Sequence, residues 1–142
     1  MDSILKNIVR VGKVSSVDSA TASVRVAFED RQGMVSYDLP VIVPWSMKNK
    51  FHYLPDVGEQ VLCLFLPNGN AQGFCLGSFY SDTDMPPAAD SGTLTIVTTG
   101  AVNIIATNNV NVTGDVIADG ISLKNHTHGG VTPGGGNTGT PS

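Results

Sequence analysis

The sequence predicts an all-β protein, and three observations favour that class. Charged residues make up only 14% of the chain, where about a quarter is typical, and there are 16 glycines. Short runs of alternating apolar and polar residues follow one another through residues 11–79 and are separated by turn residues. Beyond residue 90 an eight-residue pattern repeats with apolar residues at fixed positions. A chain of 142 residues has the length of one domain, so a second module must be small or must complete its core with other copies.

Composition also bears on the partners. The formal net charge of -4 and the pI near 5.1 provide no basic field that would hold phosphate groups, which argues against nucleic acid and anionic membrane surfaces. No segment approaches the roughly 20 apolar residues of a membrane-spanning helix. The start of the chain carries Asp2 and lacks a small-residue cleavage site, so we expect a protein that is made and assembled in the cytoplasm.

Residues 1–90 are predicted to form a base domain with a short N-terminal helix and a linker. The helix is expected because Ile4, Leu5, Ile8 and Val9 recur with helical spacing and Gly12 follows as a stop. The predicted strands are Val11 to Val17, Ala22 to Phe28, Met34 to Val43, Gln60 to Leu66 and Gly73 to Phe79. Pro67-Asn68-Gly69-Asn70 joins the last two strands and is a clear hairpin signal.

Five short antiparallel strands fit a small closed barrel, and the OB-fold is the common five-stranded Greek-key solution of this size. Many OB-folds bind single-stranded nucleic acid, but that function requires a basic groove with stacking aromatics, and the charges here are mixed. A nucleic-acid module is kept as an alternative.

The cysteines are expected to be buried, reduced thiols, because two are too few for a disulfide framework. Cys63 and Cys75 lie symmetrically about Gly69, so a cross-strand contact is open, and a bridge would require an oxidising compartment and suitable geometry. Catalytic thiols are a remote third reading, since no histidine is near them in the sequence.

The chain changes character after Asp90. From Ser91 onward it contains no aromatic residue and only three charged ones, which are Asp115, Asp119 and Lys124. The stretch from Ser81 to Asp90, with Pro86 and Pro87 between short polar residues, has the composition of a linker. We therefore place a boundary at residue 90.

Residues 91–125 contain the repeat, which is visible when TLTIVTTG, AVNIIATN and NVNVTGDV are written beneath one another. Two apolar columns fall in register, the first formed by Leu94, Val102 and Val110 and the second by Ile96, Ile104 and Val112. One polar residue separates the two columns, as on a half-buried strand.

A single copy cannot close a core from two aliphatic columns, because so little surface does not offset roughly 1 to 2 kcal/mol of backbone entropy per ordered residue. Three copies would point their columns inward and pair each strand edge with a neighbouring chain, which gives a slender trimeric β-prism. The alternatives are that this stretch adds strands to the barrel or is an unstructured tail.

Two of the three histidines, His126 and His128, occupy alternate positions just past the repeat. On an extended strand such residues face one side, so both imidazoles can reach one metal ion. Two ligands do not complete a site, and no Cys, Glu or third His lies nearby. Three chains would supply six nitrogens, the number suited to an octahedral ion such as iron(II), with no open position for a substrate. Solvated surface histidines are the alternative, and imidazole also suits zinc, nickel and copper.

The last residues, 131–142, read VTPGGGNTGTPS. The glycines, with Pro133 and Pro141 on either side of them, allow a turn of small radius without bulky side chains. The alternative is a disordered terminus.

Three stretches together cover nearly the whole chain and resemble one family. Pro55-Asp56-Val57-Gly58-Glu59-Gln60-Val61, running on to Gly77-Ser78-Phe79-Tyr80, is similar to an OB-fold core, and the octad is similar to an intertwined β-helix. The ending HTHGGVTPGGGNTGTPS is the most specific, because it is similar to a metal-binding apex. The family is that of the phage baseplate assembly protein V, or central tail spike, with its relatives in R-type pyocins. The chain departs from the family pattern in its short shaft, where residues 115–123 break the register.

The resemblance implies a homotrimer with an OB-fold base on the tail hub, a shaft at 91–125 and an apex at 126–142. His126 and His128 of all three chains would hold one iron ion (Fe²⁺) per trimer. Such a protein is a component of the virion, at the tip of the tail baseplate, and mechanically pierces the host outer membrane for a contractile phage tail or bacteriocin. Its partners would be hub and baseplate proteins, with no nucleic acid and no small-molecule substrate.

We expect the protein not to be an enzyme. No lysozyme-like insertion accompanies the three stretches. The competing class is a small metal-dependent enzyme, which would require an open coordination position and a pocket with an acid or base.

Overall fold

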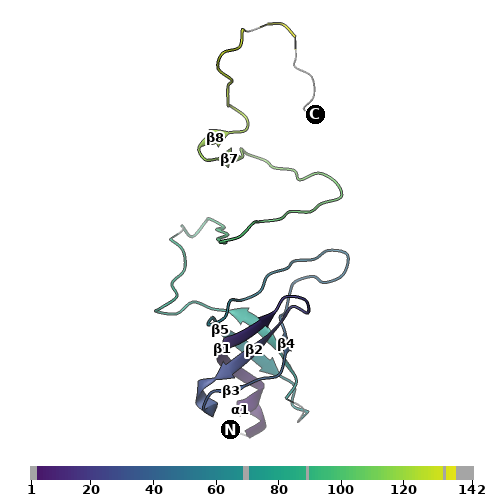
Figure 1. Cartoon of the computed structure of the whole chain (residues 1–142), viewed down its shortest axis with the longest axis vertical. Helices are drawn as coiled ribbons and strands as arrows, with labels where there is room; N and C mark the ends of the chain where they lie inside the picture. The colour runs from purple at the N-terminus through teal and green to yellow at the C-terminus, as the bar shows by residue number, and fades with distance from the viewer. Residues whose placement is uncertain (1–2, 69–70, 89, 133, 137–142) are drawn as a thin grey trace. The chain divides into compact units, whose positions relative to one another are not determined.

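The computed structural model describes residues 3–68, 71–88, 90–132 and 134–136, and it divides into two units, Met1–Thr95 and Ile96–Ser142 (Figure 1). The predicted hairpin turn falls partly on residues 69–70 and the predicted terminal turn largely on 133 and 137–142, so these lie outside the described residues. The longest described helix has six residues, which is too short to cross a membrane.

The first unit begins with helix α1 (Ser3–Ile8), and strand β1 (Val9–Asp18) follows without a break. The prediction of a helix is confirmed, but its expected end at Gly12 is wrong. Val9 and Arg10 lie opposite Leu64 and Cys63 in the ladder between β1 and β5, so tertiary pairing overrides the local helical spacing at this point.

Strand β2 (Ser23–Phe28) pairs antiparallel with β1 and confirms the second predicted strand. Its alternation points Val24, Val26 and Phe28 into the core, where each is at most 2% exposed. A short 3₁₀ helix (Glu29–Arg31) then leads to a turn at Gln32 and Gly33, both with positive φ.

The third predicted strand, Met34 to Val43, is divided in the structure into β3 (Met34–Val35) and β4 (Leu39–Pro40). Between them the Ser36 hydroxyl accepts the hydrogen bond of the Val26 backbone N–H at 3.0 Å, in the place of a ladder carbonyl. Both short strands pair with β2, so the division interrupts the strand without detaching it from the sheet.

Strands β5 (Gln60–Phe65) and β6 (Gly73–Ser78) form the predicted hairpin. The six-stranded sheet has the order β3-β2-β1-β5-β6, with β4 also beside β2. A parallel bridge between Val41, just after β4, and Cys75 of β6, with the Ile42 N–H donating to the Cys75 carbonyl at 2.9 Å, joins β4 to the β6 end of this order. The sheet therefore returns on itself.

Among the described residues, nine buried side chains form the core of the first unit: Val14, Val24, Val26, Phe28, Leu39, Val41, Val61, Cys63 and Cys75. The two cysteines are free, fully buried and directly opposite each other across β5 and β6, which confirms the prediction of buried thiols. Hydrogen bonding to Cys75 and burial both raise the pKa of the Cys63 thiol, which keeps it in the unreactive protonated form.

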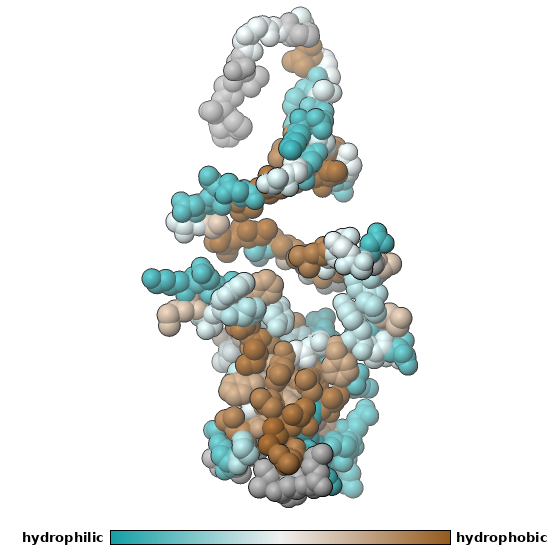
Figure 2. Space-filling view, turned by 180° about the vertical axis from the view of Figure 1, so that it is seen from behind, coloured by the Kyte–Doolittle hydropathy of each residue, from teal (hydrophilic) through white to brown (hydrophobic). Residues whose placement is uncertain are grey.

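The second unit has little secondary structure as a single chain. Within its described residues the strands are β7 (Ile117–Ala118) and β8 (Ile121–Ser122), which form a two-stranded hairpin. The six residues of the two apolar columns are between 56% and 87% exposed. Five of them lie in the second unit, and Leu94 lies at the end of the first unit. Figure 2 shows this apolar surface as brown side chains along the extended stretch that follows the base.

Candidate functional site

The hairpin that precedes the histidines is closed by a two-residue turn. Asp119 and Gly120 both have positive φ, at 49° and 83°, which is the conformation of a type I′ turn. Glycine adopts this conformation without strain and aspartate tolerates it, so Asp-Gly suits this position. The hairpin occupies the stretch where the octad register ends.

Asp115 stabilises the open end of this hairpin, away from the turn. Its carboxylate accepts hydrogen bonds from the backbone N–H groups of Val116 at 2.8 Å and Lys124 at 3.2 Å, and from the Ser122 hydroxyl. The Ser122 hydroxyl oxygen in turn accepts the Asn125 N–H at 2.9 Å. The bond from Ser122, with the backbone bonds, holds the pKa of Asp115 below its usual value.

The backbone at the end of β8 and just after it fixes the ring of His126. The His126 N–H donates to the Ser122 carbonyl at 3.1 Å, and its ring Nδ1 lies 3.0 Å from the carbonyl oxygens of both Ser122 and Leu123. Carbonyl oxygens only accept, so Nδ1 must carry the proton. In the neutral ring the free lone pair then lies on Nε2, and this is the nitrogen that can bind a metal.

The structure brings the two predicted ligands together. The ring centroids of His126 and His128 lie 5.1 Å apart with their planes at 80°, and both side chains are exposed. Two imidazoles that bind one ion at about 2.1 Å, with an angle of about 90–110° between the bonds, have ring centroids about 4.5–5.5 Å apart. The observed spacing fits a pair of neighbouring ligands.

One chain does not complete a metal site with these two residues. Within the part of the chain that the structure describes, no group of three or more His, Cys, Asp or Glu side chains is placed to hold an ion.

Sequence reasoning did not identify Asp115 and Ser122 as supports of the site. The available signal was the Asp-Gly pair at 119–120 between Val116-Ile117 and Ile121, a pattern typical of a type I′ hairpin. Ser122 pairs with Ile117 across the hairpin, so Asp115, two residues before Ile117, comes within reach of the Ser122 hydroxyl once the turn closes.

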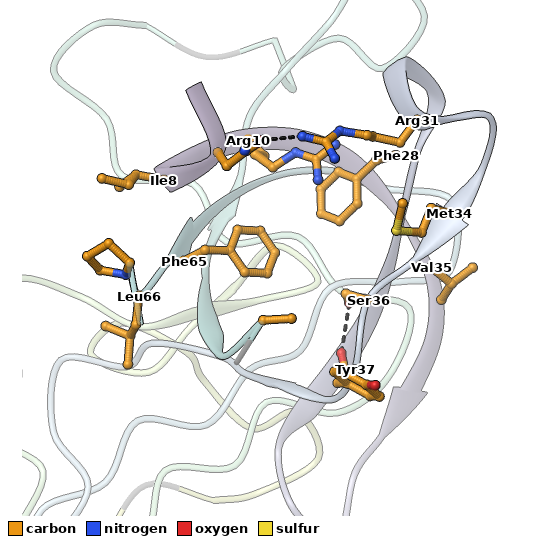
Figure 3. Close-up of a pocket in the computed structure, with 13 residues that line it drawn as sticks. Ile8, Arg10, Phe28, Arg31, Met34, Val35, Ser36, Tyr37, Phe65 and Leu66 are labelled. Carbon is orange, nitrogen blue, oxygen red and sulfur yellow. Dashed lines mark hydrogen bonds between the residues drawn. The ribbon is translucent and has the colours of Figure 1, made fainter. Parts of the chain in front are cut away.

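The base contains a pocket of about 620 Å³ between α1, the β3 edge and the end of β5 (Figure 3). Its floor is apolar and includes Phe28 and Phe65, whose rings meet edge to face at 5.8 Å. Its two cations are already engaged, because Arg10 pairs with Asp30 at 2.9 Å and lies 4.1 Å over the Phe28 ring, and Arg31 donates to Asn7. Among the described residues that line it there is no His, Asp, Glu or Cys.

The end of the chain matches a known family model. Residues 120–142 match the model described as the GpV Apex motif, a span that includes β8, His126 and His128. A comparison with curated proteins finds no match.

Proposed function

Because the apex motif supports the phage baseplate protein V or tail spike family and implies a baseplate spike component of the virion tail, we propose that this chain is the trimeric, metal-tipped central spike that pierces the host outer membrane. The match itself, over the segment that contains both paired histidines, carries the proposal. Membership of a baseplate implies assembly with other baseplate proteins.

The homotrimer is supported by the apolar columns of the octad. In one chain Val102 and Ile104 are 60% and 71% exposed, and the other members of the columns are exposed as well. Exposed aliphatic ladders of this regularity require a cover, and identical copies about a threefold axis offer identical ladders in register. The intertwined β-helix of residues 91–125 would then form only on assembly.

An OB-fold base is supported by the connectivity of the sheet. If β3 and β4 are counted as one interrupted strand, the base has five strands. Their order in the sheet is third, second, first, fourth and fifth, and the parallel bridge between Val41 and Cys75 links the third strand to the fifth. This connectivity is the one expected of a five-stranded Greek-key barrel with antiparallel neighbours and one parallel seam. Such a base, docked on the tail hub, is the wide end of the proposed spike.

The apex would hold one iron(II) ion through His126 and His128 of the three copies. The rings are already 5.1 Å apart, and Nδ1 of His126 is bonded to backbone carbonyls, so Nε2 is the donor. Six imidazole nitrogens suit an octahedral ion and leave no coordination position for a substrate, so we assign the ion a structural role. It would tie three chain ends together where fraying would otherwise begin.

Piercing in this proposal is mechanical and not enzymatic. Sheath contraction supplies the force, and the chain has only to stay folded while it transmits that force. Hydrogen bonds between copies along the shaft give axial stiffness, and the residues beyond the histidines are small enough for a narrow tip.

Native mass spectrometry of untagged protein, with elemental analysis of the bound metal, tests the proposal. We expect a trimer with about one iron ion. The double substitution His126→Ala with His128→Ala should leave the trimer intact and remove the metal. His52→Ala, which changes the remaining histidine in a loop of the base, is the matched control and should retain the ion.

The outcomes separate the parts of the proposal. A metal-free monomer would remove the threefold axis on which the shaft and the apex both depend. A trimer whose iron survives the double substitution would place the metal elsewhere. Particles assembled with the double variant should remain intact but penetrate the outer membrane less efficiently, and unchanged penetration would contradict the role of the metal tip.

A further inference from the structure

The loop between β4 and β5 carries an exposed aromatic cluster. The Phe51 ring meets Trp45 at 6.5 Å and Tyr53 at 5.7 Å, both edge to face. The Tyr53 hydroxyl donates to the Ile42 carbonyl at 3.0 Å and fixes the third ring. The side chains nevertheless remain 57%, 51% and 41% exposed in chain order. We call these three residues the aromatic cluster.

The tip of the same loop is basic. Ser46 and Lys50 form an isolated antiparallel bridge, and the Lys50 ammonium donates to the Ser46 carbonyl at 3.0 Å, so the tip has a defined shape. Lys48 lies between them and is exposed. Neither lysine forms an ion pair with any residue in the described ranges.

The linker that leaves β6 has the complementary chemistry. It begins with a turn in which the Ser81 N–H donates to the Asp84 carbonyl at 3.0 Å and the Asp84 N–H donates to the Ser81 hydroxyl at 3.2 Å. Asp82 and Asp84 are exposed and make no ion pair with the described parts of the chain. Next come Met85, which is 68% exposed, and the exposed pair at 86–87, Pro-Pro, which favours an extended polyproline conformation.

We infer that in the assembled protein the linker of one copy docks on the aromatic cluster of a neighbouring copy, with Pro86 and Pro87 on the rings and Asp82 and Asp84 beside Lys48 and Lys50. Aromatic surfaces bind extended proline segments because such segments lose little entropy on binding. The two lysines are two residues apart, and so are the two aspartates, so both lysine–aspartate ion pairs can form in one alignment of the loop and the linker.

A neighbouring copy is the occupant that the base itself favours. The loop and the linker belong to the same unit, and in Figure 1 they leave the base on different sides, the loop in blue and the linker in teal. A linker that reaches a loop across a threefold axis meets it without bending back over its own barrel. This inference rests on the proposed homotrimer. It identifies the contact by which the start of each linker would be held on the base of a neighbouring copy.

Trp45 is the one tryptophan of the chain and reports directly on the contact. In the full-length trimer we expect blue-shifted emission and slow quenching by the neutral quencher acrylamide. Asp82→Lys with Asp84→Lys, or Lys48→Asp with Lys50→Asp, should shift the emission to the red and raise the quenching several-fold. The combined fourfold reversal should restore the original signal, and Asp90→Lys in the same linker is the control that should leave it unchanged.

Crosslinking distinguishes a neighbouring copy from the same chain. A benzophenone side chain at position 47, where Met47 is 82% exposed, is irradiated in trimers mixed from ¹⁵N-labelled and unlabelled chains. We expect linked peptides that join residues 42–54 to 81–90, with heavy and light partners mixed, and loss of most of that product in the Asp82→Lys, Asp84→Lys variant.

Native mass spectrometry of the same samples separates the two proposals. A trimer in which Trp45 is fully quenchable, or in which the link is confined to one chain or absent, overturns the inference and leaves the spike intact. A sample without trimers overturns both. Docking of another baseplate protein on the cluster would leave Trp45 exposed in the isolated trimer, which again counts against the inference.

Discussion

Replacing Gly12 by alanine perturbs a close approach between β1 and β2. Gly12 is buried, and a Cβ placed on it would lie 2.5 Å from Val26 Cγ1, 2.6 Å from the Ala27 carbonyl oxygen and 2.9 Å from Phe28 Cδ1. Two of these atoms belong to side chains, but the carbonyl oxygen is backbone and cannot rotate away. The strands must therefore separate for the methyl group to fit.

The expected cost follows from this overlap. Overpacking of a core costs about 1–3 kcal/mol, and the gain from removing a glycine from a strand offsets about 0.5–1 kcal/mol. A net loss of about 1–2 kcal/mol lowers the Tm of a domain of this size by about 5–15 °C. We expect that decrease for the transition of the base, followed in the full chain by Trp45 fluorescence.

Gly92→Ala is the matched control, because no atom lies within 4 Å of its added Cβ and its φ is not positive. Its Tm should stay within a few degrees of the original. Equal Tm values for the two variants would refute the packing argument, as would a Gly12→Ala protein that melts at the original temperature.

Three further predictions concern the shaft, the hairpin and the thiols. Ile104→Asp should abolish the trimer in native mass spectrometry. Ile105→Asp should retain it, because Ile105 is 95% exposed and an extended strand points it to the side opposite Ile104. Equal behaviour of the two variants would reject the column assignment. The lowered pKa of Asp115 means that its stabilisation of the hairpin is complete above about pH 4 and is lost as the pH falls through the lowered, folded-state pKa. Asp115→Asn should remove this pH dependence from the amide protection factors of residues 116–124, and wild-type protection factors that stay constant across the acid range would contradict it. Cys63 and Cys75 should react with iodoacetamide at pH 8 only as the base unfolds, so labelling that is fast in the native protein would show that the thiols are not sealed.

Much of the base could be predicted because its strands carry their own signal. The alternation of Val24, Val26 and Phe28 predicts a half-buried strand, and those residues are buried. The end of the helix could not be predicted, since Val9 fits the helical spacing and its pairing with Leu64 depends on a strand that lies far along the chain. The division of the third strand at Ser36 could not be predicted either, because a hydroxyl that replaces a backbone acceptor does not change the hydrophobic pattern.

The proximity of the two histidines in the candidate site was predictable, and the hydrogen bonds that support the site were not. Alternate spacing was enough to expect that His126 and His128 share one side, and their rings do meet. The hydrogen bonds of Asp115 depend on the closure of the 119–120 turn, which the eight-residue repeat obscured. The trimeric β-helix remains a prediction, because the ladder that would define it would form between chains.

The two carbonyls that hold the His126 ring have a consequence for how the apex would acquire an ion. Because Nδ1 donates to Ser122 and Leu123, the orientation of the ring and its tautomer are settled when the hairpin folds. The orientational entropy of that ligand is lost at folding and does not weaken metal capture afterwards. In the proposed trimer each copy would therefore bring a preorganised Nε2 donor to the threefold axis, and assembly would be the step that creates the coordination sphere.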